Sequence, residues 1–240
     1  MGVYVYGVVR AGGAAHDAPA VRAIECGGLS ALVSDVPDKS VRIRKDSLLA
    51  HDEVLREAMQ AGPVLPMRFG VVMPDEAAVE RTLLAARAPE LSARLDALEG
   101  KVEMQVKATY AEEPLLRSIL ASEPEAAALA RRVRGLPTEA SHFDRIRLGE
   151  LIAAAVQARR ELSADELIAA VSPLAAAVSL GDPLHERMAL NAAFLVERER
   201  AGDFDGAVAR FAAQRAGELE LKLIGPLPPY SFTERENAWG

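Results

Sequence analysis

Apolar and polar residues alternate with the period of a β-strand at several places in the second half of the chain. Lys101 to Tyr110 alternates without a break, so Val102 and every second residue after it share one face. The residues between them form the opposite face of a half-buried strand: Glu103, Gln105, Lys107 and Thr109. The same period predicts strands over 174–180, 187–197 and 218–224.

Helical spacing of apolar residues fills the intervals between these strands. The signals that predict helix starts are prolines and capping residues: Pro114, Ser122 with Glu125, Thr138 and Asp203. Ser163 and Glu166 form a second capping box and predict a separate short helix to about Val171. The resulting order is β, helical region, β, β, α, β, which is a ferredoxin-like arrangement with extra helices in its first crossover.

The first half of the chain shows shorter β signals. A β-rich strand is predicted over 3–9, and a hairpin over 21–25 and 29–36. The pair Gly27-Gly28 suits a tight primed turn between the hairpin strands. A further short buried strand is predicted over 64–69, where Pro66 favours an edge or bulged position.

Helices connect these shorter strands. One is capped by Asp46 or Ser47 and ends before Gly62, with Leu48, Leu55 and Met59 on its inner face. Another begins after Asp75 and runs to about Arg87, and helical structure restarts at Pro89 and continues to Leu98. The predicted fold is therefore α+β: a small N-terminal α+β domain over 1–99, followed by a ferredoxin-like βαββαβ domain over 100–225.

The chain closes with a proline-rich segment, Gly225-Pro226-Leu227-Pro228-Pro229-Tyr230-Ser231-Phe232. Its prolines favour an extended path that cannot join the interior of a sheet. Residues 226–240 are thus predicted to form an extended tail that packs on the N-terminal domain through Pro229, Tyr230 and Phe232. The alternative is that these aromatic residues capture a partner.

Composition narrows the class of protein. The 240 residues carry a net charge of −7, with half of the residues hydrophobic, which is typical of a globular protein and unlike a nucleic-acid binder with its basic face. The single cysteine, Cys26, excludes an internal disulfide and favours a reducing cytoplasm. The longest apolar runs fall far short of the ~20 residues that cross a bilayer.

Signatures of catalysis and cofactor binding are absent from the sequence. It contains no phosphate-binding glycine loop, nucleophile elbow or HExxH zinc helix, so no catalytic, cofactor-binding or metal-binding residue is predicted. His51 lies on the apolar face of its predicted helix, which favours a core histidine over a base. Ser141, His142 and Asp144 supply triad residue types, but residues this close at a helix start more often serve as caps.

Three stretches together resemble the GvpL/GvpF family of gas vesicle proteins. They are the opening strand Gly2–Val9, the segment Val64–Val71 and the closing Gly225–Phe232, and their order spans nearly the whole chain. Leu227 departs from the pattern, because the family often carries a tryptophan there.

The resemblance implies a non-enzymatic, cytoplasmic accessory protein of gas vesicle biogenesis. Its expected partners are the hydrophobic shell protein GvpA and other gas vesicle accessory proteins, and it is expected to need no cofactor. Because Pro66 favours an exposed edge, the segment 64–69 is one candidate for the partner-binding surface, with these residues: Leu65, Met67, Arg68 and Phe69. Arg68 could pair with a carboxylate of the partner or equally close an internal salt bridge. Two alternatives stay open, a minor structural component of the vesicle or its nucleation complex, and a small-molecule-binding or enzymatic ferredoxin-like domain.

Overall fold

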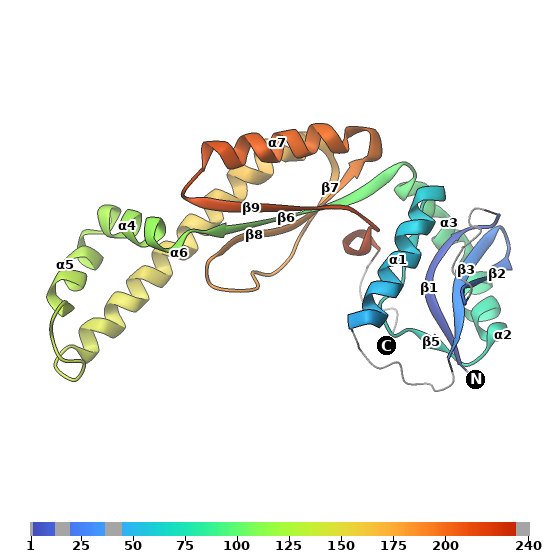
Figure 1. The fold of residues 1–240 in the computed structure, drawn as a ribbon, viewed down its shortest axis with the longest axis horizontal. Coiled ribbons are helices and arrows are strands. Elements are labelled where there is room, and N and C mark those ends of the chain that lie inside the picture. The colour runs from blue at the N-terminus through green and yellow to red at the C-terminus, as the bar shows by residue number, and fades with distance from the viewer. Residues whose placement is uncertain (1, 13–19, 37–44, 234–240) are drawn as a thin grey trace. The chain divides into compact units, whose positions relative to one another are not determined.

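The computed structural model describes residues 2–12, 20–36 and 45–233 of the chain. The chain divides into two compact units. Unit 1 comprises residues 1–104, 195–199 and 225–240, and unit 2 comprises residues 105–194 and 200–224. The elements are drawn in Figure 1.

An antiparallel sheet forms the centre of unit 1. Its path is β2 (Arg22–Cys26), β3 (Leu29–Val36), β1 (Gly2–Arg10) and β4 (Leu65–Pro66), and β5 (Val72–Met73) also pairs with β1. The predicted hairpin is confirmed: Cys26 pairs with Leu29 across Gly27 and Gly28, whose φ angles of 60° and 82° are those that a primed turn requires.

The strand predicted over 64–69 is reduced to the two residues of β4. Pro66 pairs with Gly7 at the edge of the sheet, as its missing N–H favours. The approach is close, because a Cβ on Gly7 would lie 2.8 Å from the Leu65 carbonyl oxygen. Only glycine therefore allows β1 and β4 to pack at this distance.

Helix α1 (Lys45–Ala61) packs an apolar stripe against the sheet. Its buried residues recur at helical spacing: His51, Val54, Leu55, Ala58 and Met59. The prediction that Leu48 shares this face is wrong. Leu48 is 42% exposed, because the buried stripe begins one turn later, at His51.

The second helical region of unit 1 is continuous. It consists of α2 (Glu76–Ala78), a π-helical turn η1 (Val79–Ala85) and α3 (Ala86–Leu98). Asp75 caps it as predicted, by accepting the Ala78 N–H at 2.7 Å. The predicted restart at Pro89 is wrong. A proline such as Pro89 would ordinarily interrupt the backbone hydrogen bonds of a helix. Here the widened π turn just before α3 changes the register of these bonds, and the helix continues.

A second sheet contains β6 (Lys101–Tyr110), β7 (Ala175–Leu180), β8 (Met188–Glu197) and β9 (Leu219–Leu227). Its order, β7-β8-β6-β9, is the strand order of the ferredoxin-like fold and confirms that prediction. The predicted end of the last strand at 224 is too early: β9 continues through Pro226, which an edge strand tolerates.

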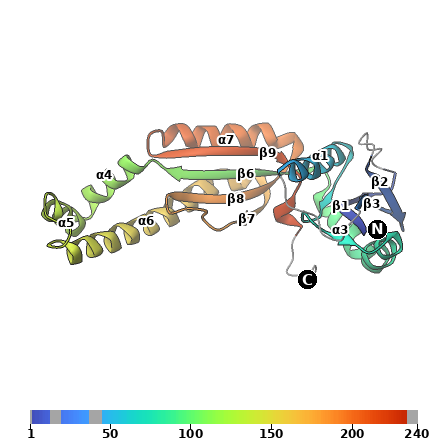
Figure 2. The same ribbon diagram turned by 60° about the horizontal axis from the view of Figure 1, so that its bottom comes forward.

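Helices α6 (His142–Val171) and α7 (Ala201–Gln214) pack together in unit 2 and lie on one face of this sheet, as Figures 1 and 2 show. From α7, Phe204 contacts Phe194 of β8 with ring centroids 5.1 Å apart. Asp203 lies within α7 rather than capping it, because a 3₁₀ turn, η3 (Arg198–Arg200), leads into the helix. From α6, Ser163 contacts Tyr110 of β6.

The extra helices of the first crossover are α4 (Glu112–Ser122), α5 (Pro124–Val133) and the first half of α6. Both predicted capping boxes are wrong. Glu123, not Ser122, precedes α5, and Ser163 lies inside the uninterrupted α6. Ser163 is 7% exposed, and its hydroxyl group is hydrogen-bonded to the Tyr110 hydroxyl group. This hydroxyl group, which the sequence pattern predicted to cap a helix, therefore bonds to a residue distant in sequence instead. Besides η3, the described residues form two further short 3₁₀ turns, η2 (Ser172–Leu174) and η4 (Tyr230–Phe232).

Candidate functional site

Aromatic rings surround His51 in unit 1. Tyr6 and Tyr230 stack on the imidazole with centroids 5.5 and 6.4 Å away, and Tyr4 and Phe69 meet it edge-on at 5.7 and 5.8 Å. These rings come from β1, from the segment after β4 and from η4. The stretches that carry the family resemblance therefore meet at one histidine.

Both ring nitrogens of His51 are hydrogen-bonded. Nε2 lies 3.1 Å from the Met67 carbonyl oxygen, which can only accept, so Nε2 carries the proton. Nδ1 then accepts from the Tyr4 hydroxyl group at 2.7 Å, and the Gly70 N–H donates to that hydroxyl oxygen at 3.3 Å. Burial lowers the pKa of His51 and raises the pKa of Tyr4 to about 12. Both groups are thus held neutral and serve a structural role.

The four residues of the predicted partner-binding surface separate in the structure. Leu65 and Met67 are each 5% exposed, so their side chains belong to the core and cannot present a surface. The Met67 N–H donates to the Tyr6 carbonyl oxygen at 2.8 Å, which ties this segment to β1. Arg68 is exposed and Phe69 is half-buried. Phe69 also borders a hollow of about 210 Å³ that Tyr6, Ser34 and His51 help to line.

The closing arm contacts unit 1 through its main chain and its side chains. Tyr230 stacks on His51, and Pro229 is buried. The Arg94 guanidinium donates to the Thr233 carbonyl oxygen at 2.9 Å. Phe232 is half-buried, and residues 234–240 of the predicted tail lie outside the described part.

Glu103 is a partner of the arm that the sequence pattern did not indicate. Its carboxylate accepts the Ser231 N–H at 2.8 Å and the Ser231 hydroxyl group at 2.9 Å. The residue is 1% exposed, although alternation placed it on the polar face of a half-buried strand. Burial raises its pKa, and the two bonds from Ser231 lower it by less. No local signal reveals this site, because its covering segment is 128 residues away in sequence.

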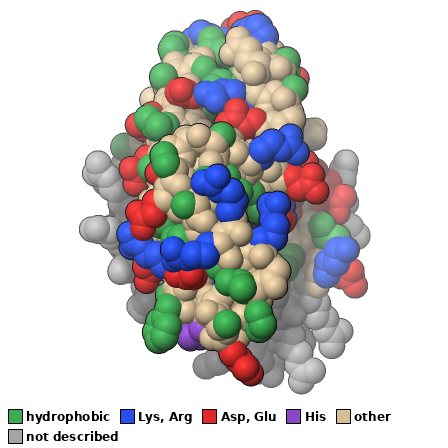
Figure 3. All heavy atoms as spheres, turned by 90° about the vertical axis from the view of Figure 1, so that its left-hand side faces the viewer, with side chains coloured by type: hydrophobic (Ala, Val, Ile, Leu, Met, Phe, Trp, Pro, Cys, Tyr) green, Lys and Arg blue, Asp and Glu red, His purple; other side chains and the backbone are tan. Residues whose placement is uncertain are grey.

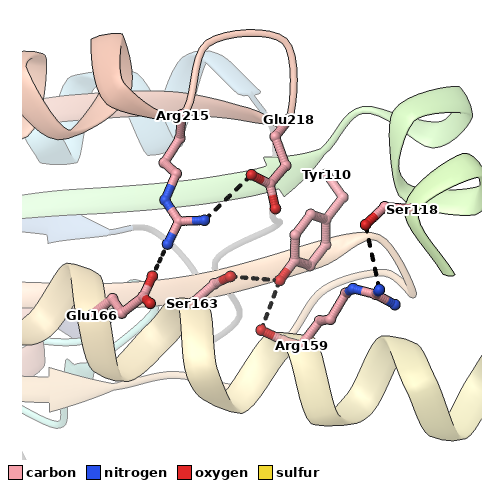
Figure 4. A network of polar contacts seen from close by, with 7 residues as sticks. All are labelled: Tyr110, Ser118, Arg159, Ser163, Glu166, Arg215 and Glu218. Atoms are coloured by element: carbon pink, nitrogen blue, oxygen red, sulfur yellow. Dashed lines mark hydrogen bonds and ion pairs between the residues drawn. The ribbon is translucent and has the colours of Figure 1, made fainter. Parts of the chain in front are cut away.

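A polar network ties the helices of unit 2 to its sheet (Figure 4). The Tyr110 hydroxyl group is hydrogen-bonded to the Arg159 carbonyl oxygen at 2.8 Å and to Ser163 Oγ at 2.7 Å. Arg215 forms ion pairs with Glu166 of α6 and with Glu218 just before β9. These contacts fix the position of α6 over β6.

Beside this network, unit 2 carries a groove of about 910 Å³. Its apolar walls are built by α4 and α6: Leu115, Leu116, Ile152, Ala153 and Val156. Its polar rim comes from α4, α6 and the loop after β7: Glu112, Gln157, Arg160, His185, Glu186 and Arg187. An apolar floor with a charged rim suits recognition of another apolar surface.

Arg160 holds the loop that contributes His185, Glu186 and Arg187 to this groove. Its guanidinium donates to the carbonyl oxygens of Glu186 at 2.7 Å and Met188 at 2.9 Å, and to the side-chain oxygen of Gln157 at 2.8 Å. The Arg187 guanidinium lies 3.6 Å from the Glu112 carboxylate of α4. The loop is therefore tied to both helices.

Basic and acidic side chains are interspersed on the face of unit 2 drawn in Figure 3. Several form ion pairs between α5 and α6, including Arg132 with Asp144 and Arg147 with Glu125. Hydrophobic side chains also reach this end of α6, where Phe143 is 83% exposed and Ile146 is 49% exposed.

The triad residue types at the start of α6 do not form a relay. Ser141 donates its hydroxyl group to the Pro137 carbonyl oxygen at 2.9 Å, and Asp144 pairs with Arg132. Within residues 2–12, 20–36 and 45–233, no three His, Cys, Asp or Glu side chains cluster as a metal site would require. No helix in the same ranges has the length and apolar character to cross a membrane.

Comparison with known proteins gives one consistent family. A family model described as gas vesicle synthesis protein GvpL/GvpF matches residues 2–234. Gas vesicle protein F of Streptomyces sp. (strain CB03234) is 40% identical, over 98% of this chain and 100% of that protein. Gas vesicle protein F of Dolichospermum flosaquae is 25% identical, over 86% of this chain and 84% of that protein.

Solved structures agree with the sequence matches. The crystal structure of GvpF from Anabaena sp. PCC7120 superposes with a TM-score of 0.80 at 26% identity, covering 98% of this chain and 99% of that one. GvpF from Microcystis aeruginosa gives a TM-score of 0.79 at 24% identity, with the same coverage, which shows the shared fold. Sequence and fold thus coincide over nearly the full length, and the chain belongs to the GvpL/GvpF family of gas vesicle proteins.

Proposed function

We propose that this gas vesicle protein is a non-enzymatic accessory factor that binds the hydrophobic shell protein GvpA and assists its assembly. The observation that carries the proposal is the groove between α4 and α6, with its apolar walls and charged rim. An assembly factor needs a surface that covers apolar groups reversibly, and such a groove supplies one. The proposed site of action is the cytoplasm, where Cys26 needs no disulfide partner.

The face of α6 that lines the groove continues toward the start of the helix. Phe143, Ile146 and Ala153 recur at intervals of three and seven residues, so they lie on one face. Phe143 and Ile146 thus extend the apolar surface beyond the groove, and Gly149 and Ala153 leave room for close approach. This geometry suits a partner segment that lays an apolar helical face along α6.

The surface expected in unit 1 becomes a smaller second candidate. Phe69 is half-buried and lines the hollow of about 210 Å³, and Arg68 beside it in sequence is exposed. The groove in unit 2 is larger, and α6, which lines it, also carries the exposed apolar residues Phe143 and Ile146. We therefore place the main contact with the shell protein in unit 2.

A matched pair of substitutions in α6 tests the proposal. Ala153 and Ala158 are both exposed alanines of this helix, but only Ala153 lines the groove. Ala153→Glu puts a charge among apolar walls, so we expect it to reduce capture of GvpA in a pull-down at least about tenfold, equivalent to about 1.4 kcal/mol. Ala158→Glu is expected to bind as the unaltered protein does.

Circular dichroism and thermal unfolding establish that both variants fold. The proposal fails if the unaltered, folded chain neither captures GvpA nor keeps it in solution. If capture occurs but Ala153→Glu leaves it unchanged, the groove is not the contact, and the same assay on Phe69→Ala then tests the surface of unit 1.

A further inference from the structure

The edges of the two sheets are protected in different ways. β2 carries Arg22 and Glu25, and Arg22 pairs with Glu76 and Asp35 at 2.6 and 2.9 Å. On the far side of the same sheet, β4 and β5 have two residues each, and β4 contains Pro66. Charges, prolines and very short strands are the features by which natural proteins prevent an edge from pairing with another chain.

The second sheet has one protected edge and one unprotected edge. β9 carries Glu220, Lys222 and Pro226. β7 is the other edge, and its sequence is Ala-Ala-Ala-Val-Ser-Leu, without a charge or a proline in any of its six residues. It is also longer than β4 or β5. Among the edges in the described part of the chain, β7 alone has none of these protective features.

Alternate residues of β7 present an exposed apolar row. Ala176, Val178 and Leu180 point to one face because strand side chains alternate. Val178 is 37% exposed and Leu180 is 65% exposed. An edge strand offers unpaired N–H and C=O groups, and here an apolar row accompanies them, which is the combination that binds another extended strand.

We propose that β7 pairs antiparallel with β7 of a second copy of this chain, about a two-fold axis at Val178. Opposite residues in an antiparallel pair share a face, so this register sets Val178 against the partner's Val178. It also places Leu180 of each copy opposite Ala176 of the other, a large residue against a small one. The absence of charge means that two identical strands meet without like-charge repulsion.

Features at the ends of the strand limit the pairing to these six residues. Pro173 lies just before β7 and Pro183 just after it, and neither can donate a backbone hydrogen bond to an added strand. The two four-stranded sheets would join into one continuous sheet. A single pair of short strands buries less surface than the ~1,200 Å² of a stable interface, so the dimer should be weak and concentration-dependent.

Sedimentation equilibrium on the full chain tests the dimer, from about 1 μM to about 1 mM. We expect the mean mass to rise from monomer toward dimer over this range. Val178→Lys is expected to remain monomeric, because two lysines would meet at the axis. Leu162→Lys is the control, since Leu162 is an exposed apolar residue of unit 2, at 65%, that lies on α6 and not on β7. If the unaltered chain stays monomeric over this whole concentration range, the proposal is overturned.

Cysteine crosslinking tests the register. In a Cys26→Ser background, Val178→Cys is expected to form a disulfide-linked dimer on mild oxidation, because residues opposite each other have Cβ atoms about 5 Å apart. Ala176→Cys is the control on the same face. The two introduced cysteines would lie about 13 Å apart along the paired strands and should not crosslink. Equal crosslinking at both positions, or none at either, would contradict a two-fold axis at Val178.

Discussion

Glu103 is a buried carboxylate whose hydrogen-bond donors in the described chain come from the closing arm. Ser231 supplies both, through its N–H and its hydroxyl group. Because burial raises the pKa of Glu103 above its ordinary value of 4.5, the folded protein binds this proton more readily than the unfolded chain does. Ionisation of Glu103 therefore opposes folding. Its unfavourable contribution is absent below pH 4.5 and grows as the pH rises through the raised pKa.

Replacement of this carboxylate by an amide should change how stability depends on pH. For Glu103→Gln we expect a free energy of unfolding at neutral pH equal to or above that of the unaltered protein, because the amide keeps a polar partner for Ser231 without a buried charge. This advantage should shrink as the pH falls from 7 to 4.5. Urea unfolding at several pH values measures the difference in free energy of unfolding between the two proteins. His51 titrates in both proteins, so its contribution cancels in this difference.

Glu103→Ala serves as the comparison for this experiment. It leaves the donors of Ser231 without an acceptor, and we expect a loss of about 1 to 3 kcal/mol near pH 4.5. The loss should be smaller at neutral pH, because the variant also removes the unfavourable ionisation of Glu103. A glutamine variant that is less stable than the unaltered protein at neutral pH, with the gap closing in acid, would show that the hydrogen bonds to the carboxylate outweigh its desolvation.

At the scale of elements, α6 combines an uninterrupted length of 30 residues with a glycine near its first third. Gly149 is exposed, and a Cβ added there would meet no atom within 4 Å. Within the described structure, no neighbouring atom requires a glycine at this position in the interior of the helix. Such a glycine weakens a helix, because it loses more backbone freedom on folding than alanine does.

Gly149→Ala is therefore expected to stabilise the protein by about 0.5 to 1 kcal/mol in urea unfolding. Gly217→Ala is a control with the opposite sign. Gly217 follows α7 with a φ angle of +80°, a conformation that alanine adopts only with strain, so that substitution should destabilise the protein. Destabilisation by both changes would mean that the groove beside Gly149 does not accept a methyl group.

At the scale of the whole molecule, the closing arm supplies contacts to three separate parts of unit 1. It meets His51 of α1 through Tyr230, Glu103 of β6 through Ser231, and Arg94 of α3 through its Thr233 carbonyl oxygen. We propose that the arm acts as a clasp for this unit. The division into domains over 1–99 and 100–225 remains a prediction.

Removal of the arm tests the clasp. A chain ending at Leu227 loses the ring stacked on His51 and both donors to Glu103. We expect faster amide hydrogen exchange in β1 and α1, with little change in α7, whose hydrogen bonds and packing lie in unit 2. Unchanged exchange in β1 and α1 would show that the arm contributes no stability to unit 1.

Local patterns were enough for most elements of this chain. The unbroken alternation of Lys101–Tyr110 and the Gly27-Gly28 turn are signals carried by neighbouring residues, and both led to the correct structure. The ferredoxin-like strand order also followed from the order of elements. At Ser163 the prediction failed because a residue distant in sequence, Tyr110, bonds to the hydroxyl group that was expected to cap a helix.

The sequence by itself determined the α+β class, the family resemblance and the lack of any recognised catalytic motif, because periodicity and motifs depend on residues close together in the chain. Only the tertiary structure decided that Leu65 and Met67 are buried, that Glu103 is covered by the arm, and that α4 and α6 enclose a groove. Burial and convergence depend on which segments pack together, and packing brings together residues more than a hundred positions apart.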